Sequence, residues 1–179
     1  MNRRTLISIH LYLASFFAPA ILIMALSGLF YLMDIKGEVG ESVVYQGQAE
    51  SIDLKATDAK EQVEALLTRL NLDADFDYLR GSKTRAVTRP TSGAHYLISV
   101  ESNNVTVTER SPSLIASIIE LHKGHGPSWF RVFQQIMAVG LVIILVSGFL
   151  LGVTSPVLKK KSWVITGIGL ASFLLLAII

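Results

Sequence analysis

The 179-residue sequence contains no cysteine. Disulfides, catalytic thiolates and cysteine-ligated metals are therefore excluded. The sequence also lacks a glycine-rich phosphate loop, a histidine–glutamate zinc motif and a nucleophile paired with a general base. These absences favour a protein that is not an enzyme, and no motif by itself assigns a metal or a cofactor.

Acidic side chains are missing from both ends of the chain. All 14 aspartates and glutamates lie between Asp34 and Glu120, and charged residues make up only 17% of the sequence. The basic residues outside this stretch lie at the ends of apolar runs: Arg3, Arg4, Arg131, Lys159, Lys160 and Lys161. The isoelectric point near 8.9 therefore reflects charges placed beside membrane spans, and it does not indicate nucleic-acid binding.

Three apolar runs are candidates for membrane spans, each of which needs roughly 20 residues. They extend over residues 6–33, about 130–153 and 162–179, and the third is barely long enough. The first run could instead be a cleaved signal peptide, because Ala18-Pro19-Ala20 has the small-x-small form of a cleavage site. However, thirteen further uncharged residues follow Ala20, and they favour an uncleaved transmembrane helix.

The stretch between the first two runs predicts a compact α+β domain. Asp58 and Glu61 resemble a capping box at the start of a helix that ends near Asn71. The apolar stripe of this helix consists of Val63, Leu66, Leu67 and Leu70. Residues of alternating polarity then predict about four antiparallel strands, with a turn at residues 102–104, and place His95 on a strand surface.

A second helix of this domain is expected directly before the second apolar run. Ser111-Pro112 is a typical start, with Ser111 as N-cap and proline at the first helical position. The predicted apolar face contains Leu114, Ile115, Ile118, Ile119 and His122, and Gly124 is expected to end the helix.

The basic residues also predict an orientation in the membrane. Cytoplasmic loops carry an excess of lysine and arginine, so Arg3, Arg4 and the three lysines at 159–161 are expected on the cytoplasmic side. The predicted organisation is an N-terminal transmembrane helix (1–33), an outward-facing α+β domain (34–127), a second transmembrane helix (128–155), and a cytoplasmic basic loop with a third transmembrane helix (156–179).

Two of the spans share a serine–glycine signature. It is Ser27-Gly28 in the first span and Ser147-Gly148 in the second, where Gly148 and Gly152 also form a Gly-x-x-x-Gly pair. Small residues let helices approach closely in lipid. We therefore predict that these five residues serve helix packing, within the protein or in a dimer.

Histidines are the residues on which a cofactor would depend. An imidazole on an apolar face beside a span is how membrane cytochromes hold haem, which makes His10, His122 and His125 the haem candidates. Packing without a ligand is the alternative for each. His10 and His122 are expected at opposite membrane faces, since residues 10–33 alone extend about 35 Å as a helix. One haem could not bridge them, so haem binding would need strained His122 and His125, a symmetric dimer or a partner subunit.

The histidine and serine–glycine segments together resemble a known family. Ile9-His10-Leu11-Tyr12-Leu13 begins the first span, and Leu121-His122-Lys123-Gly124 precedes the second. With the two serine–glycine signatures, these segments look like the PepSY-associated transmembrane proteins of bacteria, and the domain between resembles a PepSY domain. The resemblance implies an α-helical membrane protein with three transmembrane helices and a small extracytoplasmic PepSY-like α+β domain.

The resemblance also implies two functions. Some PepSY proteins inhibit or bind proteases without catalysis, so an inner-membrane accessory protein that presents its periplasmic domain to a protein or peptide partner, or to a second copy of itself, is the first expectation. Larger relatives are haem-bearing reductases of siderophore-iron uptake that use histidines at positions like His10 and His122. A small haem-binding electron-transfer subunit is therefore the alternative.

Overall fold

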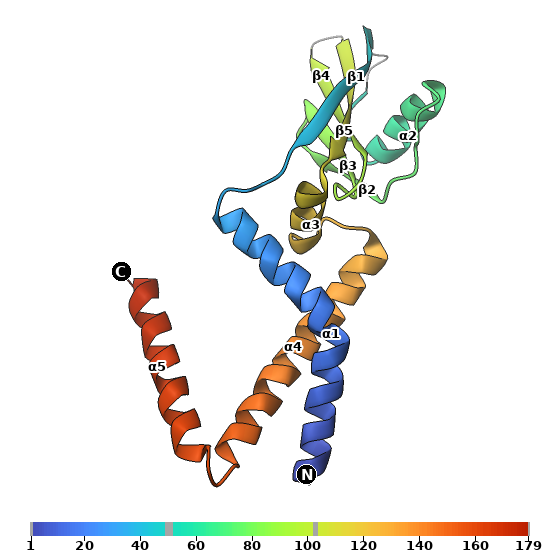
Figure 1. Ribbon diagram of the computed structural model, residues 1–179. Coiled ribbons are helices and arrows are strands. Elements are labelled where there is room, and N and C mark those ends of the chain that lie inside the picture. Colours follow the sequence, from blue (N-terminus) through green and yellow to red (C-terminus); the bar gives the residue numbers. More distant parts are fainter. Residues whose placement is uncertain (1, 49–51, 102–103, 179) are drawn as a thin grey trace. The chain divides into compact units, whose positions relative to one another are not determined.

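The computed structural model describes residues 2–48, 52–101 and 104–178. These residues form one five-stranded sheet and five helices, joined by loops (Figure 1). The helices are α1 (Arg3–Leu32), α2 (Ala59–Arg69), α3 (Leu114–His122), α4 (Ser128–Val153) and α5 (Lys159–Ile178). The strands are β1 (Val39–Gln48), β2 (Tyr78–Gly81), β3 (Arg85–Arg89), β4 (His95–Glu101) and β5 (Asn104–Pro112). Two compact units result, residues 1–21 with 135–179, and residues 22–134. The turn predicted at 102–104 falls mainly on residues outside the described ranges.

The sheet belongs to the second unit and is antiparallel throughout. Its strand order is β1-β5-β4-β3-β2, so β1 and β2 form the two edges. β1 pairs with β5 from Val39↔Pro112 to Gln48↔Asn104, with a bulge between Val43 and Tyr45. β1 is ten residues long and β2 only four, so the longer edge of the sheet is the one that β1 forms.

Helix α2 covers one face of the sheet and closes the core (Figure 1). Val63, Leu66 and Leu67 of its predicted stripe are buried, and Ile98 and Val107 lie opposite them at 0% exposure. Each fully buried side chain of this size contributes roughly 1.5–3 kcal/mol. The predicted period-3.6 stripe and the alternation of the strands are therefore confirmed.

The predicted capping box of α2 is wrong. Asp58 occupies the N-cap position but makes no side-chain cap hydrogen bond; its carboxylate instead accepts a hydrogen bond from Gln62 Nε2 at 3.1 Å. At the other end the expectation holds, because Asn71 adopts a left-handed conformation with φ 56°. Asparagine tolerates that region better than most residues, so the chain leaves the helix there.

Helix α3 begins two residues later than its sequence predicts. Ser111 and Pro112 still belong to β5, and Ser113 is the N-cap, whose Oγ accepts from the Ala116 N–H at 3.4 Å. An N-cap contributes only about 1 kcal/mol, and pairing with the long strand β1 outweighs that local preference. The predicted apolar face also shifts, since Ala116 is buried whereas Leu114 is 79% exposed.

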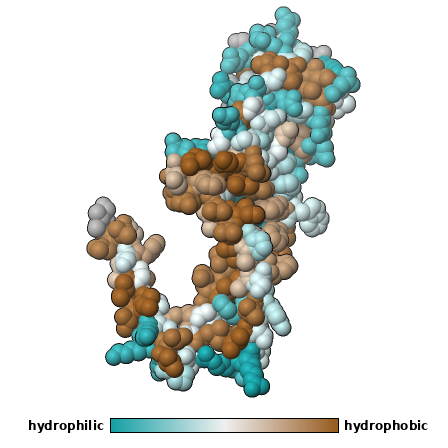
Figure 2. Space-filling model, viewed as in Figure 1, coloured by the Kyte–Doolittle hydropathy of each residue, from teal (hydrophilic) through white to brown (hydrophobic). Residues whose placement is uncertain are grey.

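Helices α1, α4 and α5 are each long and apolar enough to cross a membrane. Apolar side chains cover much of their visible surfaces, whereas polar side chains prevail around the strands (Figure 2). Pro19 lies inside α1. The three lysines at 159–161 form the first turn of α5, so the basic cluster is helical.

Candidate functional site

His122, at the end of α3, is held by the serine–glycine pair of α1. Its Nδ1 lies 2.8 Å from the Met24 carbonyl oxygen and 2.9 Å from Ser27 Oγ, while Ser27 Oγ donates to the same carbonyl at 2.8 Å. A carbonyl oxygen only accepts, so Nδ1 donates to it. Ser27 is 1% exposed, whereas His122 is an exposed residue, so the serine side of this contact is buried and the imidazole lies at the surface of the second unit.

His10 makes the same arrangement in the first unit. Its Nδ1 lies 2.9 Å from Ser147 Oγ and 3.2 Å from the Ile144 carbonyl oxygen. Ser147 Oγ donates to that carbonyl at 3.0 Å, as Ser27 does to the carbonyl three residues before it. The two serine–glycine signatures are thus two copies of one histidine-binding device.

The glycine of each signature makes room for the imidazole ring. A Cβ placed on Gly28 would stand 3.2 Å from Cε1 of His122, and one placed on Gly148 would stand 3.1 Å from Cε1 of His10. Both separations are tighter than ordinary van der Waals contact. Gly152 approaches a different group, since its added Cβ would lie 2.5 Å from Ser162 Oγ.

The histidines do not assemble into a haem site in the second unit. His125 Nδ1 lies 2.8 Å from Glu120 Oε2, whereas His122 Nδ1 is directed to Ser27 on α1, so the two rings have different surroundings and do not fit one bis-histidine site. Among the described residues, no group of three or more histidines and carboxylates could hold a metal ion. The haem candidates therefore gain no support and stay predictions.

Glu120 is the polar centre that joins α3 to the sheet. Its Oε2 accepts from Thr91 Oγ1 at 2.6 Å and from His125 Nδ1 at 2.8 Å. Its Oε1 accepts from Lys123 Nζ at 2.9 Å. Arg89 Nη1 donates to Thr91 Oγ1 at 2.7 Å and lies 3.6 Å from the Glu120 carboxylate. These four partners come from two stretches of the chain, residues 89–91 and 123–125, and Glu120 therefore fixes their mutual positions.

The pKa of Glu120 reflects that network. Burial raises the pKa, but hydrogen bonds from Thr91, Lys123 and His125 outweigh the burial and lower the pKa from its ordinary value of 4.5 to about 2. Glu120 is therefore ionised at neutral pH. Charge-assisted hydrogen bonds of this kind are roughly twice as strong as neutral ones.

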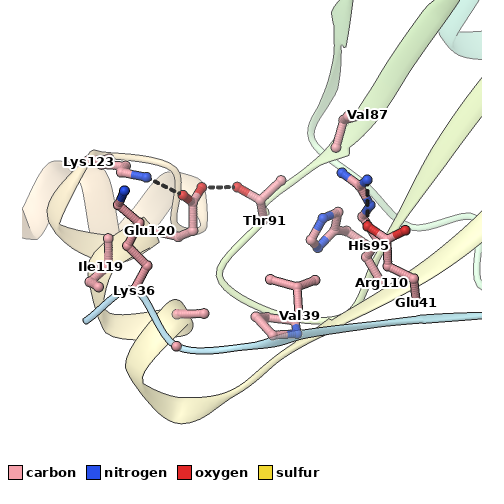
Figure 3. A pocket seen from close by; sticks show the side chains of 13 residues that line it. Lys36, Val39, Glu41, Val87, Thr91, His95, Arg110, Ile119, Glu120 and Lys123 are labelled. Atoms are coloured by element: carbon pink, nitrogen blue, oxygen red, sulfur yellow. Dashed lines mark hydrogen bonds and ion pairs between the residues drawn. The ribbon is translucent and has the colours of Figure 1, made fainter. Parts of the chain in front are cut away.

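A pocket of about 360 Å³ opens beside Glu120, between α3 and one end of the sheet (Figure 3). We call it the polar pocket because five charged side chains line it. Its charged lining consists of Lys36, Glu41, Arg110, Glu120 and Lys123, and its other named walls include Val39, Thr91 and Ile119. Arg110 Nη2 lies 2.6 Å from Glu41 Oε1. Three cations and two carboxylates thus line the pocket.

His95 also lines this pocket, and its predicted place on a strand surface is wrong. The residue is 7% exposed, and its Nδ1–H donates to the Gly93 carbonyl at 2.8 Å. Burial, reinforced by the neighbouring Arg110 and Arg89, lowers the pKa of His95. The side chain points into the end of the domain that α3 covers, which its local sequence pattern does not indicate.

A second, mostly apolar pocket of about 290 Å³ lies between α1 and α3. It is lined by Ser27, Gly28, Tyr31, Ile119, His122 and Lys123. Two lysines lie near the ring of Tyr31: Lys36 Nζ is 5.7 Å and Lys123 Nζ is 5.2 Å from the ring centroid. Lysine ammonium groups at such distances are attracted by the ring.

The sequence model of the PepSY_TM-like family matches residues 50–179. The chain belongs to this family. Searches of curated proteins and of solved structures returned no match. The family resemblance drawn from the histidine and serine–glycine segments is thereby confirmed, and it is consistent with the three apolar helices and the sheet-containing domain.

For this PepSY_TM-like chain, the sequence singled out the histidines and the serine–glycine pairs but did not connect them. It missed Lys36, Thr91, Arg110 and Glu120 altogether. One feature of the sequence does point to Glu120, because it is the only carboxylate in the mostly apolar helix α3. A lone carboxylate on an apolar face indicates a paired, buried group, and that reasoning could have found it.

Proposed function

We propose that the chain is a three-span protein of the bacterial cytoplasmic membrane that presents its sheet domain outside the cytoplasm to a protein or peptide partner. Three apolar helices and membership of the PepSY_TM-like family support the membrane placement. Arg3, Arg4 and the three lysines at 159–161 support a cytoplasmic N-terminus under the positive-inside rule. The role is that of an accessory or interaction module.

The observation that carries the partner-binding part is the open edge of β1. This ten-residue strand pairs on one side with β5, and no other described strand pairs with it. Long open edges are templates for an added strand. Val43 and Val44 are 60% and 37% exposed there, so β1 offers both free backbone groups and apolar side chains to an extended peptide.

Topology is testable with unusual clarity because the chain has no cysteine. Single cysteines placed at Lys83 in the sheet domain and at Lys160 in the basic cluster are labelled in intact cells with a membrane-impermeant maleimide. We expect labelling of Lys83→Cys without permeabilisation and of Lys160→Cys only after it. Labelling of Lys160→Cys in intact cells, with Lys83→Cys protected, would reverse the proposed orientation.

Partner binding is tested by a photo-crosslinking residue placed at Val43 on β1, with the same residue at Glu64 on α2 as control. We expect a discrete crosslinked product from position 43 and none from position 64. A Val44→Pro variant should remove the product, because proline blocks an added strand, while Val44→Ala should retain it. A product that forms equally from both positions, or survives Val44→Pro in a folded chain, contradicts docking on β1.

A further inference from the structure

The polar and the apolar pockets of the second unit adjoin one another. Ile119 and Lys123 line both of them. These residues are four positions apart on and just after α3, and side chains with that spacing share a helix face. The two pockets therefore meet along one face of α3, and they are called the polar chamber and the apolar chamber below.

Two lysines mark the border between the chambers. Lys36 follows α1 and Lys123 follows α3, and both ammonium groups lie within 6 Å of the ring of Tyr31. Lys36 is also paired with Asp34, 2.5 Å away. Their side chains remain 58% and 41% exposed, so both retain hydrogen-bond donors for a ligand. Figure 3 labels both lysines, together with Glu120, among the residues that line the pocket.

The charges of the polar chamber favour an anionic group. Lys36, Arg110 and Lys123 outnumber Glu41 and Glu120 by one among its lining residues. Arg110 pairs with Glu41 and Lys123 with Glu120, whereas the partner of Lys36 is Asp34, which is not among those lining residues. The apolar chamber has no carboxylate among its lining residues and is walled largely by Tyr31, Ile119 and the His122 ring. A ligand that suits both chambers carries a negative head and an apolar tail.

We propose that the two chambers together bind one anionic phospholipid. Its phosphate lies against Lys36 and Lys123 at the border, its head enters the polar chamber, and one acyl chain enters the apolar chamber between α1 and α3. Basic side chains at the end of a membrane helix attract anionic headgroups, and a tyrosine at that level is typical of the interface.

A lipid is favoured over a free phosphate by the apolar chamber, because a free anion would leave that chamber unused. The proposal rests on the membrane placement of α1 proposed above, but not on docking at β1. Lipid binding in detergent solution is independent of a protein partner, so its failure and the failure of β1 docking are separate results.

The test is native mass spectrometry of the full chain released from detergent micelles. The probes are phosphatidylglycerol, phosphatidylcholine with the same acyl chains, and inorganic phosphate. We expect one phosphatidylglycerol per chain, bound about tenfold more tightly than phosphatidylcholine. The Lys36→Gln/Lys123→Gln double variant should lose most of that preference. The Lys36→Arg/Lys123→Arg double variant should keep it. Lys83 is an exposed lysine elsewhere in the domain, and Lys83→Gln should not change the preference.

Three outcomes overturn the proposal. Equal affinity for the two lipids excludes recognition of an anionic head. Unchanged phosphatidylglycerol binding in the glutamine double variant excludes the two lysines. Saturation by inorganic phosphate as tight as that of phosphatidylglycerol shows a free-anion site in place of a lipid site. The arginine variant keeps the test valid if the glutamine variant folds poorly, since it retains both charges.

Discussion

Removal of the Glu120 charge is the most direct perturbation of the domain. Glu120→Gln keeps the shape of the side chain but replaces a carboxylate that accepts from Thr91, Lys123 and His125. The lowering of its pKa from 4.5 to about 2 corresponds to roughly 3 kcal/mol of stabilisation. The side chain is 23% exposed, and water screens part of that interaction. We therefore expect a loss of about 1–3 kcal/mol at pH 7.

The pH dependence has a definite sign. Because the pKa of Glu120 is lower in the folded than in the unfolded state, its contribution is complete above about pH 4.5 and is lost as the pH falls toward about 2. The difference between wild type and Glu120→Gln should therefore be large at pH 7 and shrink steadily below pH 4.5. Arg89, Lys123 and His125 are the charged or titratable groups that face the carboxylate, and their cationic forms favour its ionisation.

The assay is hydrogen exchange of β3, β4 and β5 in the full chain, measured by mass spectrometry in increasing urea at several pH values. These strands report on the sheet domain without interference from the apolar helices. Glu64→Gln is the matched control, since Glu64 forms an exposed pair with Lys60, which contributes about 0–1 kcal/mol. If Glu120→Gln costs no more than this control, or if its cost is the same at pH 3 as at pH 7, the role assigned to Glu120 is refuted.

Two further predictions use the same assay. Ser27→Ala removes the hydroxyl beside His122 Nδ1 and should lower the free energy of unfolding of the second unit by about 0.5–1.5 kcal/mol. The control Ser42→Ala, at an exposed position of β1, should leave that free energy unchanged. Equal effects of the two substitutions would mean that the serine contact contributes nothing. Leu67→Ala removes a side chain that is 0% exposed and should cost about 2–5 kcal/mol, clearly more than Leu70→Ala at the partly exposed end of the helix.

The pairing of His122 with Ser27 illustrates what could not be predicted from the chain. The two residues are 95 positions apart in sequence, and nothing in their local patterns connects them. The same holds for His10 and Ser147, 137 positions apart. The sequence marked all four residues as unusual, because polar side chains beside or within apolar runs are rare, but which histidine meets which serine depends on the path of the whole chain.

The start of α3 shows the opposite case, in which a helix-start pattern is present in the sequence but strand pairing outweighs it. Ser111-Pro112 is a typical helix start, yet both residues pair with β1. Backbone pairing along ten residues of strand outweighs one N-cap, and Ser113 takes over the cap. His95 was misassigned for a similar reason, since its burial depends on α3 and the neighbouring strands and not on its own strand alone.

By itself the sequence determined the three apolar helices, the stripe of α2, the alternation of β4 and β5, and the family. Those features follow from the local period of apolar residues and from the length of uncharged runs, which each segment carries independently of the others. The tertiary structure alone decided the Glu120 network, the two histidine–serine contacts and the adjoining pockets at Lys123. Those features arise where segments distant in sequence satisfy one another's buried polar groups, and no single segment contains that information.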